Sequence, residues 1–138
     1  MIGFIIGNKG SGKTKRLIDK ANQAAEQSKG NVVCVEKGKK LIYELKHGVR
    51  LIDTDAYAIS GFDTFYGMLA GVCACDYDLT DVFVDATLKI GGRDYEQFAD
   101  FAEKLNKVAD ETQTNFIFTV SCDESELPER IFQFAEKI

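Results

Sequence analysis

The chain of 138 residues lacks the long apolar runs that membrane proteins need. No run approaches the roughly 18–20 residues of a membrane-spanning helix, and the short apolar start, residues 1–6, continues directly into a glycine-rich stretch. We therefore expect no membrane segment, no signal peptide and a cytoplasmic protein. Repeats, linkers and low-complexity stretches are also missing, so the length suits one compact domain over residues 1–138.

Metal-binding side chains are scarce. The single histidine, His47, is far in sequence from Cys73 and Cys75, and one residue separates these two cysteines where a zinc knuckle has two. The thiols of a cytoplasmic protein stay reduced. We therefore expect packed, reduced thiols rather than a metal site. The four cysteines are Cys34, Cys73, Cys75 and Cys122.

Positive charge is in deficit as well, since the formal net charge is −5 at pH 7. This balance argues against general binding to nucleic acid. The charge is unevenly placed, because residues 1–50 carry a balance of +7 and residues 51–138 a balance of −12. A basic first half suits a polyanionic nucleotide. The asymmetry either promotes head-to-tail self-association or is neutralised between neighbouring elements of one domain, and we favour the second interpretation.

The most informative stretch that is present is rich in glycine. It reads Gly7-Asn8-Lys9-Gly10-Ser11-Gly12-Lys13-Thr14, the pattern G-x-x-x-x-G-K-T. The apolar residues 1–6 before it predict a buried strand, and the periodic apolar positions of residues 13–28 predict an amphipathic helix. A strand, a glycine-rich turn and a helix start are the context that a phosphate-binding loop needs.

Each part of this stretch has a chemical purpose. The glycines allow backbone conformations that turn N–H groups inward around phosphate oxygens, and the following helix adds the positive end of its dipole. We expect Lys13 to reach the β- and γ-phosphates, and the Thr14 hydroxyl to coordinate a magnesium ion shared with them. On these residues the chain resembles the P-loop NTPase superfamily, which implies that the loop binds a nucleoside triphosphate.

Strands and helices alternate along the rest of the chain. Further buried strands are predicted at residues 32–36, 49–53, 82–85 and 115–121. Further helices are predicted at residues 41–45, 65–72 and 94–111, and in a closing segment whose first turn contains Pro128 and which includes Ala135. This alternation predicts a three-layer α/β/α P-loop fold with a mostly parallel sheet, which binds ligands at the carboxyl ends of its strands.

Two segments are harder to interpret. Ser60 or Asp63 can cap the helix at residues 65–72, where Gly67 and Gly71 are expected to allow close packing on the sheet. Residues 87–93 are expected to form a loop, because Gly91-Gly92 interrupts any helical pattern.

A magnesium site needs a second ligand besides Thr14. Asp85 is the best candidate, because it ends the apolar run Val82-Phe83-Val84 as a Walker B aspartate does. Asp53, followed by Asp55, is the rival at the end of another predicted strand. With Asp85 in this role, the chain resembles the division of P-loop proteins in which another strand lies between the P-loop strand and the Walker B strand. RecA-like and twitching-motility ATPases belong to that division.

The chain departs from the pattern of this division at one position. Many ATPases of this division carry a glutamate directly after the aspartate, where it polarises the attacking water. Here the position is Ala86, which has no proton acceptor, so we expect hydrolysis to be slow or absent; Asp53, Asp55 and Thr87 are substitutes in principle. Thr119 and Ser121, which end the last long strand, are candidate sensors of the γ-phosphate. Arg93 is either a surface turn residue, which we favour, or an arginine finger.

These patterns predict a protein that binds ATP and Mg²⁺, with Lys13 and Asp85 as the catalytic candidates, acting as a slow ATPase or a nucleotide-dependent switch. The alternative is a small-molecule or nucleotide kinase, for which Gly91 to Asp94 is at best a minimal lid. The guanine-reading motif N-K-x-D is absent, since Asn106-Lys107 continues as Val108-Ala109. A protein partner or a homo-oligomer stays open, and motor activity is not expected.

Overall fold

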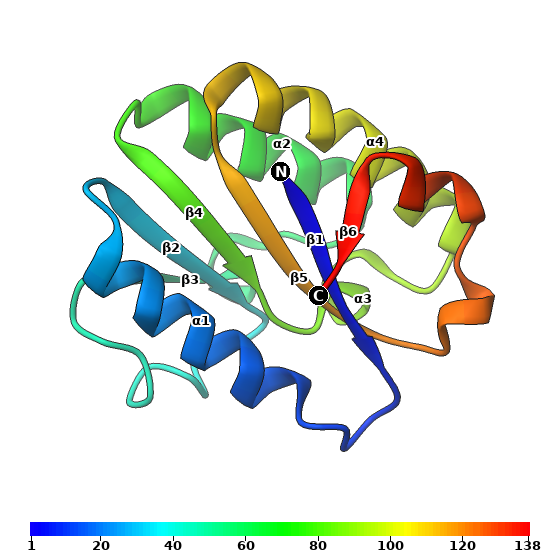
Figure 1. Ribbon diagram of the computed structural model, residues 1–138, viewed down its shortest axis with the longest axis horizontal. Coiled ribbons are helices and arrows are strands. Elements are labelled where there is room, and N and C mark those ends of the chain that lie inside the picture. Colours follow the sequence, from blue (N-terminus) through cyan, green and yellow to red (C-terminus); the bar gives the residue numbers. More distant parts are fainter.

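Six parallel strands form one sheet at the centre of the computed structural model, which describes residues 1–138 (Figure 1). They are β1 (Ile2–Gly7), β2 (Asn31–Glu36), β3 (Val49–Asp53), β4 (Leu79–Val84), β5 (Asn115–Ser121) and β6 (Ala135–Lys137). Their spatial order is β3-β2-β4-β5-β1-β6, and every neighbouring pair is parallel. The predicted α/β class is thereby confirmed.

Helices cover both faces of the sheet and give the predicted three layers (Figure 1). On one face lies α1 (Lys13–Gln27), whose Leu17, Ile18 and Ala21 pack on Ile5 and other residues of the sheet. On the other face lie α2 (Phe62–Cys75) and α4 (Tyr95–Thr112). The short α3 (Thr87–Gly91) follows β4. None of these helices combines the length and the apolar character that crossing a bilayer requires.

The larger core lies under α2 and α4 and is built from aromatic rings. Ring centroids 5–7 Å apart are typical of favourable aromatic pairs, and Phe65 stacks on Phe101 with centroids 5.3 Å apart. Seven other ring pairs link the same cluster, which comprises Phe4, Phe62, Phe65, Phe98, Phe101, Phe116 and Phe118. Asp94 begins α4 as predicted, because its carboxylate accepts hydrogen bonds from the N–H groups of Glu96 and Gln97, both at 3.1 Å.

The strand order decides where a site can form. β5 lies between β1 and β4, so the sequence-based expectation of a strand between the glycine-rich loop and Asp85 is met. Since all strands point the same way, the carboxyl ends of β1, β5 and β4 lie next to one another along one edge of the sheet.

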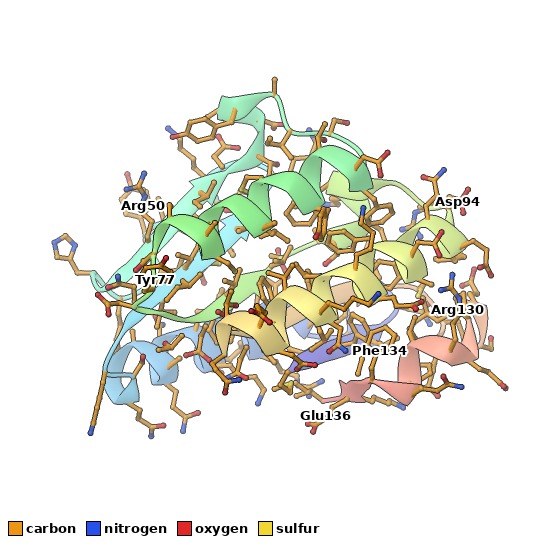
Figure 2. All side chains as sticks on the ribbon, turned by 90° about the horizontal axis from the view of Figure 1, so that it is seen from above. Arg50, Tyr77, Asp94, Arg130, Phe134 and Glu136 are labelled. Carbon is orange, nitrogen blue, oxygen red and sulfur yellow. The ribbon has the colours of Figure 1, made fainter.

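The prediction of a closing helix is wrong. The segment forms a short 3₁₀ helix, Glu129–Gln133, and then the strand β6, which pairs with β1. Arg130, labelled in Figure 2, holds this segment against α4 through Glu96, Asp100 and Glu103, at 3.1, 2.7 and 2.9 Å. Pairing with the free edge of β1 satisfies the backbone of residues 135–137 without a helix.

Three further expectations are corrected. Residues 87–93 contain α3 instead of being loop throughout, and residues 41–45 form turns instead of a helix. Neither Ser60 nor Asp63 caps α2, which begins after Gly61 without a side-chain cap. Gly67 and Gly71 face solvent, where a Cβ would meet no atom within 4 Å, so they do not pack on the sheet.

Candidate functional site

The glycine-rich loop leaves β1 and enters α1 at Lys13. Its shape requires glycine at two kinds of position. Gly10 and Gly12 have φ angles of +86° and +83°, which side chains disfavour. At Gly7 the space is the constraint, because a Cβ would lie 2.6 Å from the Ser11 hydroxyl oxygen. The loop therefore depends on the glycines of the sequence motif for its conformation.

Lys13 lies across this loop and is only 7% exposed. Its ammonium donates hydrogen bonds to the Asn8 carbonyl at 2.9 Å and to the Ser11 hydroxyl at 3.4 Å. Burial lowers the pKa of Lys13, while the nearby Asp85 carboxylate acts in the opposite direction. The Lys13 ammonium is thus partly removed from water, and both of its hydrogen-bond partners are neutral. An anion that bound here would compensate the buried positive charge.

Asp85 joins the loop to the middle of the sheet. It follows β4, is 9% exposed, and its Oδ1 accepts hydrogen bonds from the Thr14 hydroxyl at 3.1 Å and the Thr119 hydroxyl at 2.9 Å. These contacts span 71 and 34 residues of sequence. The structure thus brings together the two predicted metal ligands, Thr14 and Asp85, and places a candidate sensor beside them.

Ala86 directly follows Asp85, and its backbone is unusual. Its φ of 58° and ψ of 54° are left-handed, and its N–H donates to the Thr119 hydroxyl at 2.7 Å. This turn redirects the chain from β4 into α3. Non-glycine residues adopt such a conformation at a cost of roughly 1–3 kcal/mol, and they cluster at functional sites.

The rival acidic pair lies elsewhere. Asp53 accepts hydrogen bonds from the N–H groups of Gly38 and Asp55, at 2.8 and 2.9 Å, and Asp55 pairs with Lys37 at 2.7 Å. β3 is one of the two edge strands, with β2 between it and β4. Asp53 and Asp55 therefore hold the loop after β2 and do not join Asp85. Thr87 is fully buried, and its hydroxyl has no hydrogen-bond partner.

A cavity of about 640 Å³ opens above this edge of the sheet. Its lining residues are Lys9, Gly10, Gly12, Lys13, Thr14, Lys15, Asp85, Ala86, Lys89, Arg93, Thr119 and Ser121. Four lysines and one arginine thus face a single carboxylate. Arg93 reaches back over β5, where its Nη1 donates to the Ser121 carbonyl at 3.2 Å. A cavity with this balance of charge suits a polyanion.

Sequence reasoning missed three charged groups at or near the cavity, of which Lys15 directly follows the predicted loop. Lys89 lies on α3, which was expected to be loop, and only its spacing of four residues from Asp85 hinted at a shared site. Glu36 ends β2 and is 4% exposed, with its carboxylate accepting from the N–H groups of Lys40 and Leu41 at 3.2 and 3.1 Å. Burial raises the pKa of Glu36, and Asp85 adds to the rise.

The oxygen donors here suit one kind of metal site. No group of three or more His, Cys, Asp or Glu side chains is placed to hold an ion by itself. Thr14 and Asp85 offer one hydroxyl and one carboxylate. Mg²⁺ is commonly held by one or two such groups together with substrate phosphates, whereas dedicated protein cages are rare for it. The donor set therefore fits a magnesium ion that arrives with a nucleotide.

Comparison with known proteins identifies no relative: no family model matches the chain, and no curated protein matches it.

Proposed function

We propose that the chain is a P-loop protein of the RecA-like, additional-strand type, and that it binds a nucleoside triphosphate, most simply ATP, with Mg²⁺. The observation that carries the proposal is the hydrogen bond of 3.1 Å from the Thr14 hydroxyl to Asp85, since it joins the start of α1 to the end of β4. The cationic cavity around this contact supports the same assignment.

Each residue has a defined task under this proposal. The N–H groups of the loop from Asn8 to Thr14 and the ammonium of Lys13 bind phosphate oxygens. Thr14 and Asp85 hold the magnesium ion, which neutralises phosphate charge when bound. Thr119, already hydrogen-bonded to Asp85 and to the N–H of Ala86, responds to changes at the terminal phosphate.

Hydrolysis is slow or absent under this proposal. A water molecule needs a proton acceptor to attack efficiently. Among the residues lining the cavity, Asp85 is the single carboxylate, and it is assigned to the metal. Glu36 is engaged with the backbone of the loop that follows β2. Toward water, the nucleotide site is therefore a slow ATPase or a nucleotide-dependent switch, and motor activity is not expected.

The test is calorimetric titration with ATP, in Mg²⁺ and in excess EDTA, on wild type and Lys13→Met. A hydrogen bond to a charged group contributes about 1.5–3 kcal/mol, so Lys13→Met is expected to weaken binding by about 10- to 100-fold. Lys29→Met is the matched control, because Lys29 is exposed and lies beyond the other end of α1. It should bind ATP like wild type.

Asp85→Asn tests the metal ligand separately. We expect the gain in ATP affinity that Mg²⁺ gives over EDTA to be smaller in this variant than in wild type, because it lacks the charged one of the two metal ligands. A wild-type protein that binds no nucleoside triphosphate under any of these conditions would contradict the proposal, and the glycine-rich loop would then be a structural turn.

A further inference from the structure

We propose that the site transfers the terminal phosphoryl group of its nucleotide to an acceptor that is already an oxyanion, a phosphate monoester or a carboxylate, bound by Lys89 and Arg93. The inference rests on the nucleotide site proposed above and assigns the class of its second substrate. Two independent features of the cavity lead to it: cations that the nucleotide site leaves unused, and a missing general base.

The unused cations are Lys89 and Arg93. Of the five cationic side chains that line the cavity, Lys9 and Lys13 belong to the phosphate loop and Lys15 pairs with Asp19 at 3.3 Å. The other two form no ion pair, and Asp85 is the only carboxylate among the lining residues. A triphosphate that shares a divalent cation is already partly neutralised, so positive charge remains for a second anion.

Packing fixes α3, which carries Lys89, and a separate hydrogen bond holds Arg93, which follows α3. At Gly91, at the end of α3, a Cβ would lie 2.1 Å from the ring of Phe62, so only glycine allows this contact with α2. The Ile90 carbonyl accepts from the N–H of Gly61 at 2.9 Å. Arg93 is held over the end of β5 by the Ser121 carbonyl. The two cations thus border the cavity on the side of β4 and β5, whereas the phosphate loop borders it at β1.

The missing base selects the acceptor. Water or an alcohol must lose a proton as it attacks, which requires a positioned proton acceptor. Ala86 has none, and Asp85, the one carboxylate that lines the cavity, is assigned to the metal together with Thr14. A phosphate or carboxylate oxygen is deprotonated at neutral pH and needs no base. Its obstacle is repulsion from the triphosphate, which cations at the point of approach reduce.

The proposed step forms one P–O bond, breaks another and transfers no proton. An acceptor oxyanion attacks the γ-phosphorus and forms a new P–O bond. The bond from that phosphorus to the β,γ-bridging oxygen breaks, and its electron pair stays on the nucleoside diphosphate. A phosphate monoester becomes a phosphoanhydride, and a carboxylate becomes an acyl phosphate. Lys89 and Arg93 act as acceptor-binding residues.

The first test measures the acceptor subsite with inorganic phosphate as the probe. Phosphate is titrated calorimetrically into protein saturated with Mg²⁺ and the non-hydrolysable analogue adenylyl imidodiphosphate. We expect binding to wild type, and at least about tenfold weaker binding to Lys89→Met and to Arg93→Met. Lys29→Met should match wild type. Thermal unfolding of each variant verifies that it is folded.

The outcomes separate this inference from the nucleotide site. If the analogue itself does not bind wild type, the proposed function fails. If the analogue binds and phosphate does not, the acceptor subsite is refuted. If Lys89→Met and Arg93→Met weaken the analogue as much as phosphate, these cations hold the γ-phosphate, which also refutes the subsite.

The second test measures ADP formation from ATP and Mg²⁺ with three sets of acceptors. AMP and glycerol 3-phosphate represent phosphate monoesters, acetate and glutamate represent carboxylates, and adenosine and glycerol are the neutral controls. Stimulation by one anionic set, lost in Lys89→Met, supports the transfer and identifies the acceptor class. Stimulation by the neutral alcohols, or by none of the sets, overturns it.

Discussion

At the scale of single residues, the four thiols show how burial controls reactivity. Cys34, Cys73 and Cys122 are buried, whereas Cys75 is exposed near the end of α2. Burial raises the pKa of Cys34 to about 12 and that of Cys122 to about 11, and neighbouring carboxylates act in the same direction. The thiolate is the nucleophilic form of cysteine. These two cysteines are therefore unreactive for two reasons: they are inaccessible to reagents, and they stay protonated.

This difference predicts the labelling pattern of the native protein. With iodoacetamide at pH 8, we expect one thiol per chain to react quickly, and four after denaturation in urea, as counted by mass spectrometry. Cys75→Ser should abolish the fast reaction. Raising the pH to 9 should not make Cys34 react with iodoacetamide, because the pKa of its thiol lies well above 9. Fast labelling of a second thiol in native wild type at pH 8 would contradict the assignment.

Lys13 illustrates the cost of a buried charge in the unliganded protein. Burial lowers its pKa, so the ammonium is less favourable in the folded state than in the unfolded chain. The cost is present at pH values below the lowered pKa and disappears as the pH rises through it. At pH 7 we therefore expect the free energy of unfolding of Lys13→Met, measured in urea, to equal or slightly exceed that of wild type. A clear loss of stability would show that the ammonium mainly serves the fold.

At the scale of elements, the turn between β4 and α3 combines a backbone cost with a position in the site. Ala86 and Ala58 are both left-handed, with φ of 58° and 55°, whereas Ala74 lies in the helix α2. Glycine adopts the left-handed conformation at no steric cost but weakens a helix. The same substitution should therefore have opposite effects at these positions.

We expect Ala86→Gly and Ala58→Gly each to raise the free energy of unfolding by about 1 kcal/mol, and Ala74→Gly to lower it by a smaller amount, because Ala74 lies in the last turn of α2. Urea denaturation of the three variants measures this. Because Ala58 does not line the cavity, it separates the backbone effect from any effect on the site. Destabilisation by Ala86→Gly alone would indicate that contacts at the strand end, and not φ, hold this turn.

Elements with a strong local signal could be predicted from the sequence. β3 and β5 have the predicted bounds, and α4 differs by one residue at each end, because apolar periodicity and the Asp94 cap specify them locally. α3 and β6 could not be predicted. α3 has only five residues, too few for periodicity, and β6 exists because β1 offers a free edge, which is a property of the assembled sheet.

The same distinction applies to the site. The glycine-rich loop is a local signal, and Asp85 was recognisable because an apolar run precedes it. Lys89 and Glu36 carry no such signal, since their positions depend on how α3 and the loop after β2 fold back over the sheet. Gly67 and Gly71 were misplaced for a related reason: helical spacing alone does not reveal whether a small residue faces the sheet or solvent.

At the scale of the whole molecule, the site and the sheet are coupled. Lys13 and Thr14 follow β1, Asp85 follows β4, and β5 lies between these strands. A ligand held by both groups therefore links three neighbouring strands. If the chain is one domain over residues 1–138, as its length suggests, such a ligand should stabilise the entire fold.

Thermal unfolding tests this coupling. At an ATP concentration of about 100 times the Kd, in Mg²⁺, linkage adds about 2.7 kcal/mol to the free energy of unfolding. With an unfolding entropy of about 2.1 cal/mol/K per residue, a chain of this size should gain about 9 °C in Tm. The gain should be retained by Lys29→Met and reduced to about half or less by Lys13→Met at the same ATP concentration. A single transition that moves as a whole is expected. Two transitions, of which ATP shifts only one, would mean that the site stabilises only part of the chain and that the single-domain prediction is wrong.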